Sequence, residues 1–259
     1  MAERRSRRRR RRGRFSFLYK LLSVILILAA LVAGCIVFFR VETVVITGST
    51  VYTDEEIIAA AGVEQGDNLF LIGAVQTGRK ITSQLPYIST ASLRRALPGT
   101  LVITVTECIS AGVLKGEDGT WWVLDSSCKL LEQGGKELAG KHAQITGLTA
   151  LMPAVGKQLA VSVEESAKMD SLKKLLTALT ERDMLAQVQS IDLSGTSEIK
   201  MTYDGRFTVL MPLYSDDFRE LVHRLQAAAE SEYLNAGQTG TLDLTVKRSD
   251  GAWGVFIQD

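Results

Sequence analysis

The sequence predicts an α+β protein with a single transmembrane helix, then a small βααββ domain, then a β-rich domain with two amphipathic helices. Three observations lead to this fold class. A long uncharged apolar run follows a basic tail, short β-branched segments then flank two helical patterns, and frequent strands surround two further helical periodicities in the rest of the chain. The expected units are a basic tail at 1–20, the transmembrane helix at 21–39, the small domain at 41–108 and the β-rich domain at 109–259.

The apolar run has the length of a membrane span. Its 19 residues, Leu21–Phe39, would form a helix of roughly 28 Å, close to the roughly 30 Å hydrocarbon core of a bilayer. The stretch VAGC at 32–35 resembles a lipobox, and cleavage before Cys35 would give a lipid-anchored protein instead. Because the chain stays apolar up to Arg40 and does not enter a polar tether, we favour the uncleaved anchor.

Positive charge is concentrated before the apolar run. Residues 1–20 hold ten of the 30 basic side chains and one of the 29 acidic ones, so the remainder, with 20 basic and 28 acidic side chains, is net acidic. The positive-inside rule then places the amino terminus in the cytoplasm and the later domains outside. We expect the basic tail to set topology and attract anionic lipid headgroups, and we expect no nucleic-acid binding. The arginines assigned this role are Arg7, Arg8, Arg9, Arg10, Arg11 and Arg12.

The small domain shows clear local signals. Thr53 and Glu56 have the spacing of a capping box, and Gly62 is suited to end the helix that follows. Pro86 stops a second helical pattern. The expected elements are strands at 41–47, 87–97 and 101–107 and helices at 54–61 and 73–85.

The β-rich domain is punctuated by hairpin signals. Asp118-Gly119 and Asp204-Gly205 each separate two strand patterns, as the turns of β-hairpins do. Two longer segments instead carry apolar side chains at helical spacing. The expected elements are strands at 111–116, 119–125, 129–133, 188–195, 197–203, 206–212, 241–248 and 253–258 and helices at 166–185 and 215–234.

Residues that could carry catalysis are scattered. We expect His142 in a polar loop and His223 on the charged side of the last helix, both solvated. The stretch 73–80 approaches a phosphate-binding loop, but arginine occupies the lysine position and lysine the hydroxyl position. Residues 171–174 match the pattern S-x-x-K without its companion motifs. We therefore expect no enzyme activity, no catalytic residue, no cofactor and no metal site.

Two cysteines fall in the exported part of the chain. Cys108 and Cys128 lie where a disulfide is permitted, but they have neither CxxC nor metal-ligand spacing. The sequence leaves both a bridge and two small buried thiols open.

Four stretches resemble a known family. TGSTVYTDEEIIAAAGVEQGDNLFLI at 47–72 and LPYISTASLRRALPGTLVITVTE at 85–107 are similar to the start and end of the POTRA domain of the FtsQ/DivIB family of bacterial cell-division proteins. IDLS at 191–194 and GTLDL at 240–244 are similar to stretches of the β domain that follows it. Cys108 departs from the pattern, because the family has a familiar arginine after the last glutamate of this domain.

The resemblance implies a POTRA-type small domain and a non-catalytic divisome component in the cytoplasmic membrane, at the division septum. Such a protein would bind FtsB/DivIC-like and FtsL-like bitopic partners and help to regulate septal peptidoglycan synthesis. In this family the partner adds a strand at the end of the β domain, and a free sheet edge can accept one. The matching segments are Thr241–Arg248 and Trp253–Gln258.

The partner-binding residues expected on this basis combine apolar, aromatic and basic side chains. Trp253 and Phe256 would be anchors, and Lys247 and Arg248 would attract acidic partner residues. Whichever strand face points inward would instead belong to the core. The full set is Leu242, Leu244, Val246, Lys247, Arg248, Trp253, Val255 and Phe256.

Two alternatives remain. A POTRA unit could belong to a module for export or outer-membrane assembly, although that function calls for several POTRA repeats or a following barrel, which this sequence does not show. A lipoprotein processed before Cys35 would keep the exported domains but lose the span.

Overall fold

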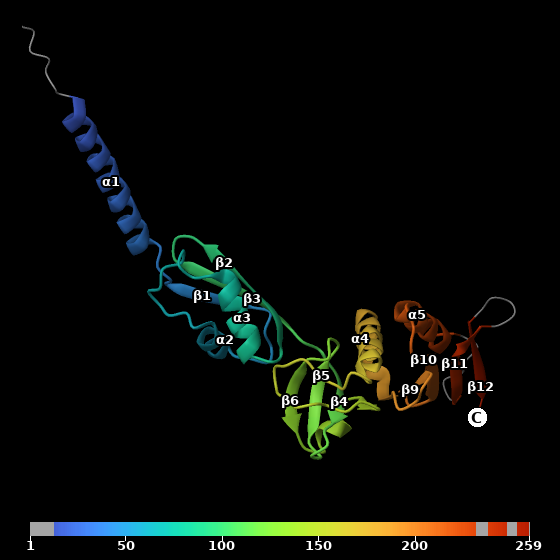
Figure 1. Cartoon of the computed structure of the whole chain (residues 1–259). Coiled ribbons are helices and arrows are strands. Elements are labelled where there is room, and N and C mark those ends of the chain that lie inside the picture. The colour runs from blue at the N-terminus through green and yellow to red at the C-terminus, as the bar shows by residue number, and fades with distance from the viewer. Residues whose placement is uncertain (1–12, 232–237, 248–252, 259) are drawn as a thin grey trace, which may run out of the picture.

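The computed structural model describes residues 13–231, 238–247 and 253–258 and confirms the predicted α+β architecture (Figure 1). A long helix, α1 (Gly13–Phe38), leads into a small domain built on a three-stranded sheet, and a large domain built on a nine-stranded sheet follows. Within the described ranges one helix is long and apolar enough to cross a membrane, over Phe17–Phe38. It runs without a break through Cys35.

The small domain has the predicted order strand, helix, helix, strand, strand. Its sheet has the order β1-β3-β2, with β1 parallel to β3 and β2 antiparallel to it. Ile57 and Ile81 from the two helices and Ile103 from β3 are fully buried in its core. The elements are β1 (Thr43–Thr47), α2 (Asp54–Ala61), α3 (Ala74–Gln84), β2 (Ile88–Ala96) and β3 (Thr100–Glu107).

The start of α2 confirms the predicted capping box. The Thr53 hydroxyl accepts a hydrogen bond of 3.3 Å from the backbone N–H of Glu56, and the Glu56 carboxylate accepts one of 2.9 Å from the backbone N–H of Thr53. Gly62 ends the helix at φ +62°, a conformation that glycine adopts without steric cost.

The large domain is one sheet of order β12-β11-β10-β9-β8-β7-β4-β5-β6. All eight predicted strands and both predicted helices are present, and the structure adds β7, a three-residue strand that the sequence analysis omits. The elements are β4 (Ser110–Lys115), β5 (Trp121–Asp125), β6 (Leu130–Gly134), β7 (Gln144–Thr146), α4 (Ser166–Glu181), β8 (Val188–Asp192), β9 (Glu198–Tyr203), β10 (Phe207–Pro212), α5 (Phe218–Ala229), β11 (Gly240–Lys247) and β12 (Trp253–Gln258).

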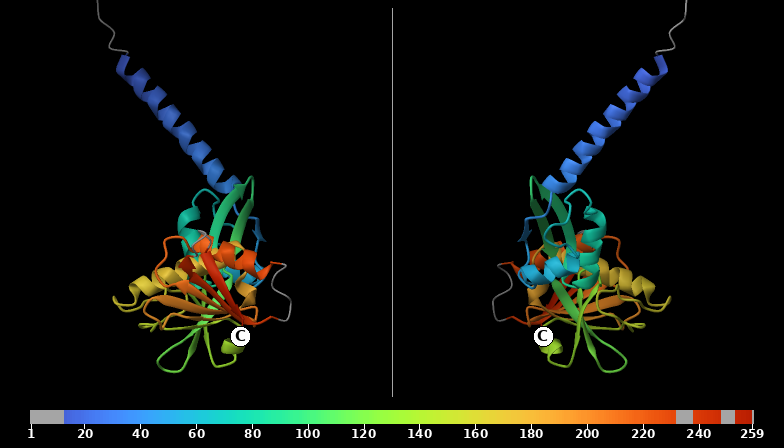
Figure 2. Two further views of the ribbon diagram at one scale, coloured as in Figure 1. Left: turned by 90° about the vertical axis from the view of Figure 1, so that its right-hand side faces the viewer. Right: turned by 90° about the vertical axis from the view of Figure 1, so that its left-hand side faces the viewer.

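Helices α4 and α5 pack against each other and lie on the same side of the fanned sheet (Figures 1 and 2). The alternation of β10 shows which face they cover: Phe207, Val209 and Met211 are buried, whereas the residues between them are only partly buried. Because β10 and β11 are parallel, the chain must cross over between them, and α5 lies in that crossover. Among the residues that the structure describes, no helix lies on the opposite face of this half of the sheet.

Helix α5 is shorter than the predicted 215–234. It begins at Phe218 because the Asp217 side chain caps it, accepting a hydrogen bond of 3.0 Å from the backbone N–H of Glu220. It ends at Ala229, and part of the predicted range lies outside the described residues.

The two domains meet at a hydrogen-bonded joint. The Lys129 ammonium of the large domain donates to the carbonyl oxygens of Ile88 at 3.0 Å and Thr82 at 3.4 Å in the small domain. The Tyr87 hydroxyl of the small domain donates to the Glu132 carboxylate at 2.7 Å. Tyr87 also packs, with Cys108, against a small apolar cluster of the large domain: Val113, Val123, Leu131 and Leu138.

Cys108 and Cys128 are free thiols in this structure: Cys108 packs at the joint, and Cys128 is buried in the main core of the large domain. Burial, reinforced by the nearby Asp125 carboxylate, raises the pKa of Cys108 to about 11 and that of Cys128 to about 12. Both thiols are therefore protonated near neutral pH and lack the thiolate that reacts.

Candidate partner-binding surface

The terminal strand β12 occupies one edge of the nine-stranded sheet (Figure 1). It pairs antiparallel with β11 along Gly240–Asp243, and among the described residues no strand pairs with its other side. An edge of this kind presents unpaired N–H and C=O groups to which an extended segment can add. Of the two segments singled out by the sequence, β12 forms the free edge and β11 is the strand next to it, paired on both sides.

Three of the expected partner-binding residues face the core instead. Leu242 and Leu244 are 4% and 2% exposed and belong to the main core of the large domain. Phe256, opposite Leu242, packs against the same core, with its ring centroid 6.2 Å from that of Phe207. Leu242 and Leu244 are therefore structural, and Phe256 is at most partly available as an anchor.

The other face of the edge is apolar and accessible. Val255 and Ile257 are 36% and 56% exposed and point away from Phe256, because successive side chains of a strand alternate between faces. Val246, near the end of β11, is 45% exposed. Ile257 is missing from the residues expected from the sequence, although its alternation with Phe256 is the signal that could have identified it.

A bulge interrupts the pairing of β11 with β12. Asp243 pairs with Val255 and Lys247 with Trp253, so the first strand has two extra residues in this interval. The Asp243 carboxylate holds the bulge by accepting hydrogen bonds from the Thr245 N–H at 2.9 Å and the Thr245 hydroxyl at 2.6 Å. Opposite it, Gly254 has φ +96°, a conformation that an L side chain rarely adopts.

The structure describes only some of the remaining residues predicted to bind the partner or lipid. Lys247 and Trp253 pair through their backbones in the sheet, and Arg248 lies outside the described residues. The arginines of the tail, Arg7 to Arg12, also lie outside them. The basic and lipid-binding roles given to these side chains stay predictions.

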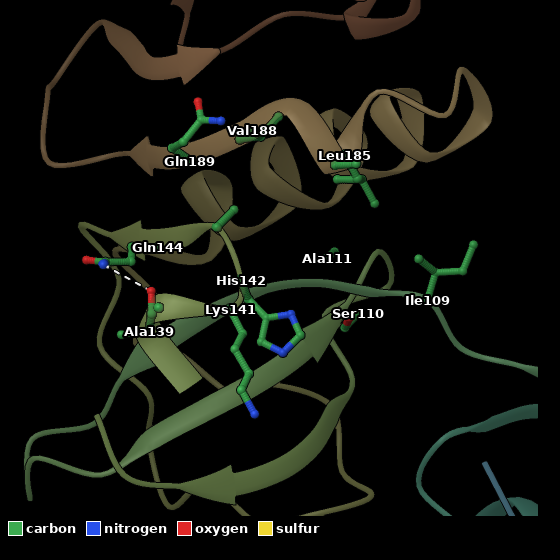
Figure 3. A pocket seen from close by; sticks show the side chains of 13 residues that line it. Ile109, Ser110, Ala111, Ala139, Lys141, His142, Gln144, Leu185, Val188 and Gln189 are labelled. Atoms are coloured by element: carbon green, nitrogen blue, oxygen red, sulfur yellow. Dashed lines mark hydrogen bonds between the residues drawn. The ribbon is translucent and has the colours of Figure 1, made fainter. Parts of the chain in front are cut away.

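A cleft of about 610 Å³ opens where β4, β7 and β8 begin (Figure 3). His142 and Lys141 lie next to each other in its lining, with Ile109 and Leu185 at other points of the wall. His142 is half-buried, not solvated as expected, and burial lowers the pKa of its imidazole. Among the described residues of the lining there is no carboxylate or thiol, so the cleft offers neither a metal-ligand set nor an acid–base pair.

The two weak enzyme motifs have structural explanations. Residues 74–80 lie in helix α3, where Gly78 lets the helix approach β2: a Cβ at this position would lie 2.6 Å from the Ala91 carbonyl oxygen. Ser171 of the S-x-x-K stretch is buried on the core face of α4. His223 is exposed on α5, as predicted.

Residues 39–107 match the FtsQ-type POTRA domain family. The cell division protein FtsQ of Corynebacterium glutamicum is 26% identical over 170 residues, which cover 64% of this chain and 74% of that protein. FtsQ of Mycobacteroides abscessus is 26% identical over 194 residues, covering 73% and 57% respectively. The cell division protein DivIB of Clostridium tetani is 20% identical over 225 residues, covering 86% and 83%.

The matched range of the POTRA family coincides with the small domain, whose strand and helix order is described above. The apolar helix before it supplies a membrane anchor. The small domain is therefore an FtsQ-type POTRA domain, and the relatives named FtsQ and DivIB, together with the apolar helix, support the FtsQ/DivIB family and a membrane-anchored cell division protein.

Proposed function

We propose that this protein is a non-catalytic divisome component that binds FtsB/DivIC-like and FtsL-like bitopic partners through its large domain and thereby helps to regulate septal peptidoglycan synthesis. The amino terminus lies in the cytoplasm, the two domains lie outside, and the protein concentrates at the septum. The charge asymmetry around the span supports this orientation. The relatives named FtsQ and DivIB, which are cell division proteins, support the role in division.

The observation that carries the proposal is the free edge of β12 beside exposed apolar side chains. A partner segment would extend the sheet by pairing with the backbone of β12, which gives affinity without requiring a particular sequence. Val255 and Ile257 would contact alternate side chains of that segment, which gives specificity. Lys247 and Arg248 would favour a segment with acidic residues at one end.

The binding test uses the full chain in detergent or nanodiscs and the purified ectodomain of an FtsB/DivIC-like partner. The variant Val255→Glu with Ile257→Glu places charge on the exposed face of the edge without disturbing the core. We expect its dissociation constant to rise at least about tenfold, or roughly 1.4 kcal/mol, in calorimetry. Val163→Glu, at a position that is 91% exposed elsewhere in the large domain, is the matched control. Equal affinities for all three chains would reject the edge as the binding site.

The cellular test is a fluorescent protein fused to residue 1. A band at midcell would support septal localisation, whereas an even membrane outline would contradict it. The same fusion tests the anchor on a gel. A full-length band is expected, and a short tagged fragment would show that the chain is cleaved before Cys35.

A further inference from the structure

The loop at residues 68–72, with the sequence NLFLI, is tied to the outer end of α1. The Asn68 side-chain amide donates to the carbonyl oxygen of Ile36 at 3.1 Å, inside the last turns of the helix. The Leu69 N–H donates to the Phe39 carbonyl oxygen at 3.0 Å, and Arg40 forms a β-bridge with Asn68. These bonds hold the loop at the level where the apolar helix ends.

That level is the boundary of the bilayer. The candidate span, Phe17–Phe38, has 22 residues. A helix of this size is about 33 Å long, slightly more than the roughly 30 Å hydrocarbon core. Phe38 and Phe39 therefore lie near the lipid headgroups, a position that aromatic side chains favour. The loop hydrogen-bonded beside them lies at the same depth.

Large apolar side chains project from the small domain at this depth. Leu71 is 81% exposed and Phe70 is 53% exposed, although Phe70 stacks edge-to-face on Phe39 with centroids 5.1 Å apart. The turn between β2 and β3 reaches the same end of the domain, beside the end of α1 (Figures 1 and 2). Leu97 in that turn is 58% exposed.

Arg95 connects the loop at residues 68–72 to the turn between β2 and β3. Its guanidinium donates to the carbonyl oxygens of Leu69 and Ile72 and lies 5.8 Å from the centroid of the Phe70 ring. Arg95 belongs to β2 and stands two residues before Leu97, so the loop and the turn form one surface. This surface has a set geometry relative to α1.

We propose that Phe70, Leu71 and Leu97 form a lipid-contact surface by which the small domain rests on the membrane leaflet at the outer end of α1. The lipid interface is the occupant because the surface is continuous with the span, and the exposed side chains have the apolar character that this boundary accommodates. Both signs of charge border it: Arg40 and Arg95 contact the loop, Asp67 directly precedes it, and Glu42 lies against Gly99 in the turn. The contact therefore depends on insertion of apolar side chains and not on attraction to anionic lipid.

The test is tryptophan quenching in vesicles of phosphatidylcholine whose acyl chains are brominated early or late. The full chain is reconstituted as the wild type, as Leu71→Trp and as Val51→Trp. Val51 is a matched control because it lies in the same domain and is 53% exposed, but its N–H binds Glu107 at the far end of β3. The native tryptophans are common to all three chains and provide the baseline.

We expect the tryptophan added at position 71 to lose roughly half of its emission with early bromines, as a side chain about 5–10 Å into the headgroup boundary would, and less with late ones. The tryptophan at position 51 should lose none. Leu97→Trp, on the other segment, should behave like Leu71→Trp. Quenching at positions 71 and 97 no greater than at position 51 would overturn the proposal and would leave the surface to a protein partner. The outcome is independent of the proposed strand addition at β12.

Discussion

The Glu107 carboxylate accepts a hydrogen bond of 2.7 Å from the backbone N–H of Thr50, joining the end of β3 to the loop before α2. The Val51 N–H, at 2.8 Å, and the hydroxyls of Ser49 and Thr50 donate to the same carboxylate. Burial opposes the charge on Glu107, but these hydrogen bonds outweigh it and lower its pKa to about 2. One carboxylate thus accepts four hydrogen bonds from the loop at residues 49–51.

Glu107 should make the stability of the small domain depend on acid pH. Because its pKa is lower in the folded chain, its contribution is fully present above the ordinary value of 4.5 and is lost as the pH falls toward about 2. Glu107→Gln should lower the melting temperature at pH 7, and its difference from the wild type should shrink below pH 4.5. Thermal unfolding followed by circular dichroism at several pH values measures both. A difference that does not change with pH would contradict this role.

Gly78 should be intolerant of a methyl group. The Cβ of Gly78→Ala would lie 2.6 Å from the Ala91 carbonyl oxygen, so α3 would have to move away from β2. We expect a loss of about 1–3 kcal/mol in the free energy of unfolding. Gly140→Ala is the control, since a Cβ there meets no atom within 4 Å. Denaturant titration compares the two variants, and equal stabilities would show that the helix relaxes freely.

Phe256 and Ile257 should separate stability from binding. Phe256→Ala removes a ring that packs against the core and Phe207, so we expect a loss of about 1–3 kcal/mol in unfolding free energy, below the range for a fully buried ring. Ile257→Ala, at an exposed position, should cost less than about 0.5 kcal/mol. Yet Ile257→Ala should weaken partner binding in calorimetry. If Ile257→Ala lowered the unfolding free energy more than Phe256→Ala, then Ile257 and not Phe256 would face the core.

Tyr87 should contribute to the joint between the domains. Tyr87→Phe keeps the ring in its apolar cluster but removes the hydrogen bond of 2.7 Å to Glu132. We expect a loss of about 0.5–1.5 kcal/mol in unfolding free energy. Tyr214→Phe, at an exposed tyrosine of the large domain, is the control and should be neutral. If both variants melted like the wild type, the hydroxyl of Tyr87 would contribute nothing to the joint.

Local signals in the sequence predicted most of the elements. The capping box of Thr53 and Glu56 and the turns at Asp118 and Asp204 are formed by neighbouring residues, so their chemistry is visible in the chain itself. Strand β7 was missed because three residues are too few to show a period. The parallel pairing of β10 with β11 and of β7 with β8 joins distant segments, and no local pattern encodes it.

The candidate surface could be located from the sequence but not oriented. The family resemblance indicated the terminal strands, and the last of them, β12, does lie at a sheet edge with β11 beside it. Which of their side chains faces outward depends on the core they pack against and on the bulge at Asp243, neither of which alternation alone reveals. This is why Leu242 and Leu244 were expected at the partner surface and Ile257 was not.

The joint formed by Lys129 and Tyr87 fixes the position of the large domain relative to the small domain. It makes the small domain a spacer between the membrane and the large domain, and the bonds from the loop at 68–72 to α1 fix the lower end of that spacer in the same way. With the span inserted as proposed, the free edge of β12 would be held at a set height above the lipid. A protein anchored in the same membrane can reach that edge only if its own stalk carries the binding segment to the same height.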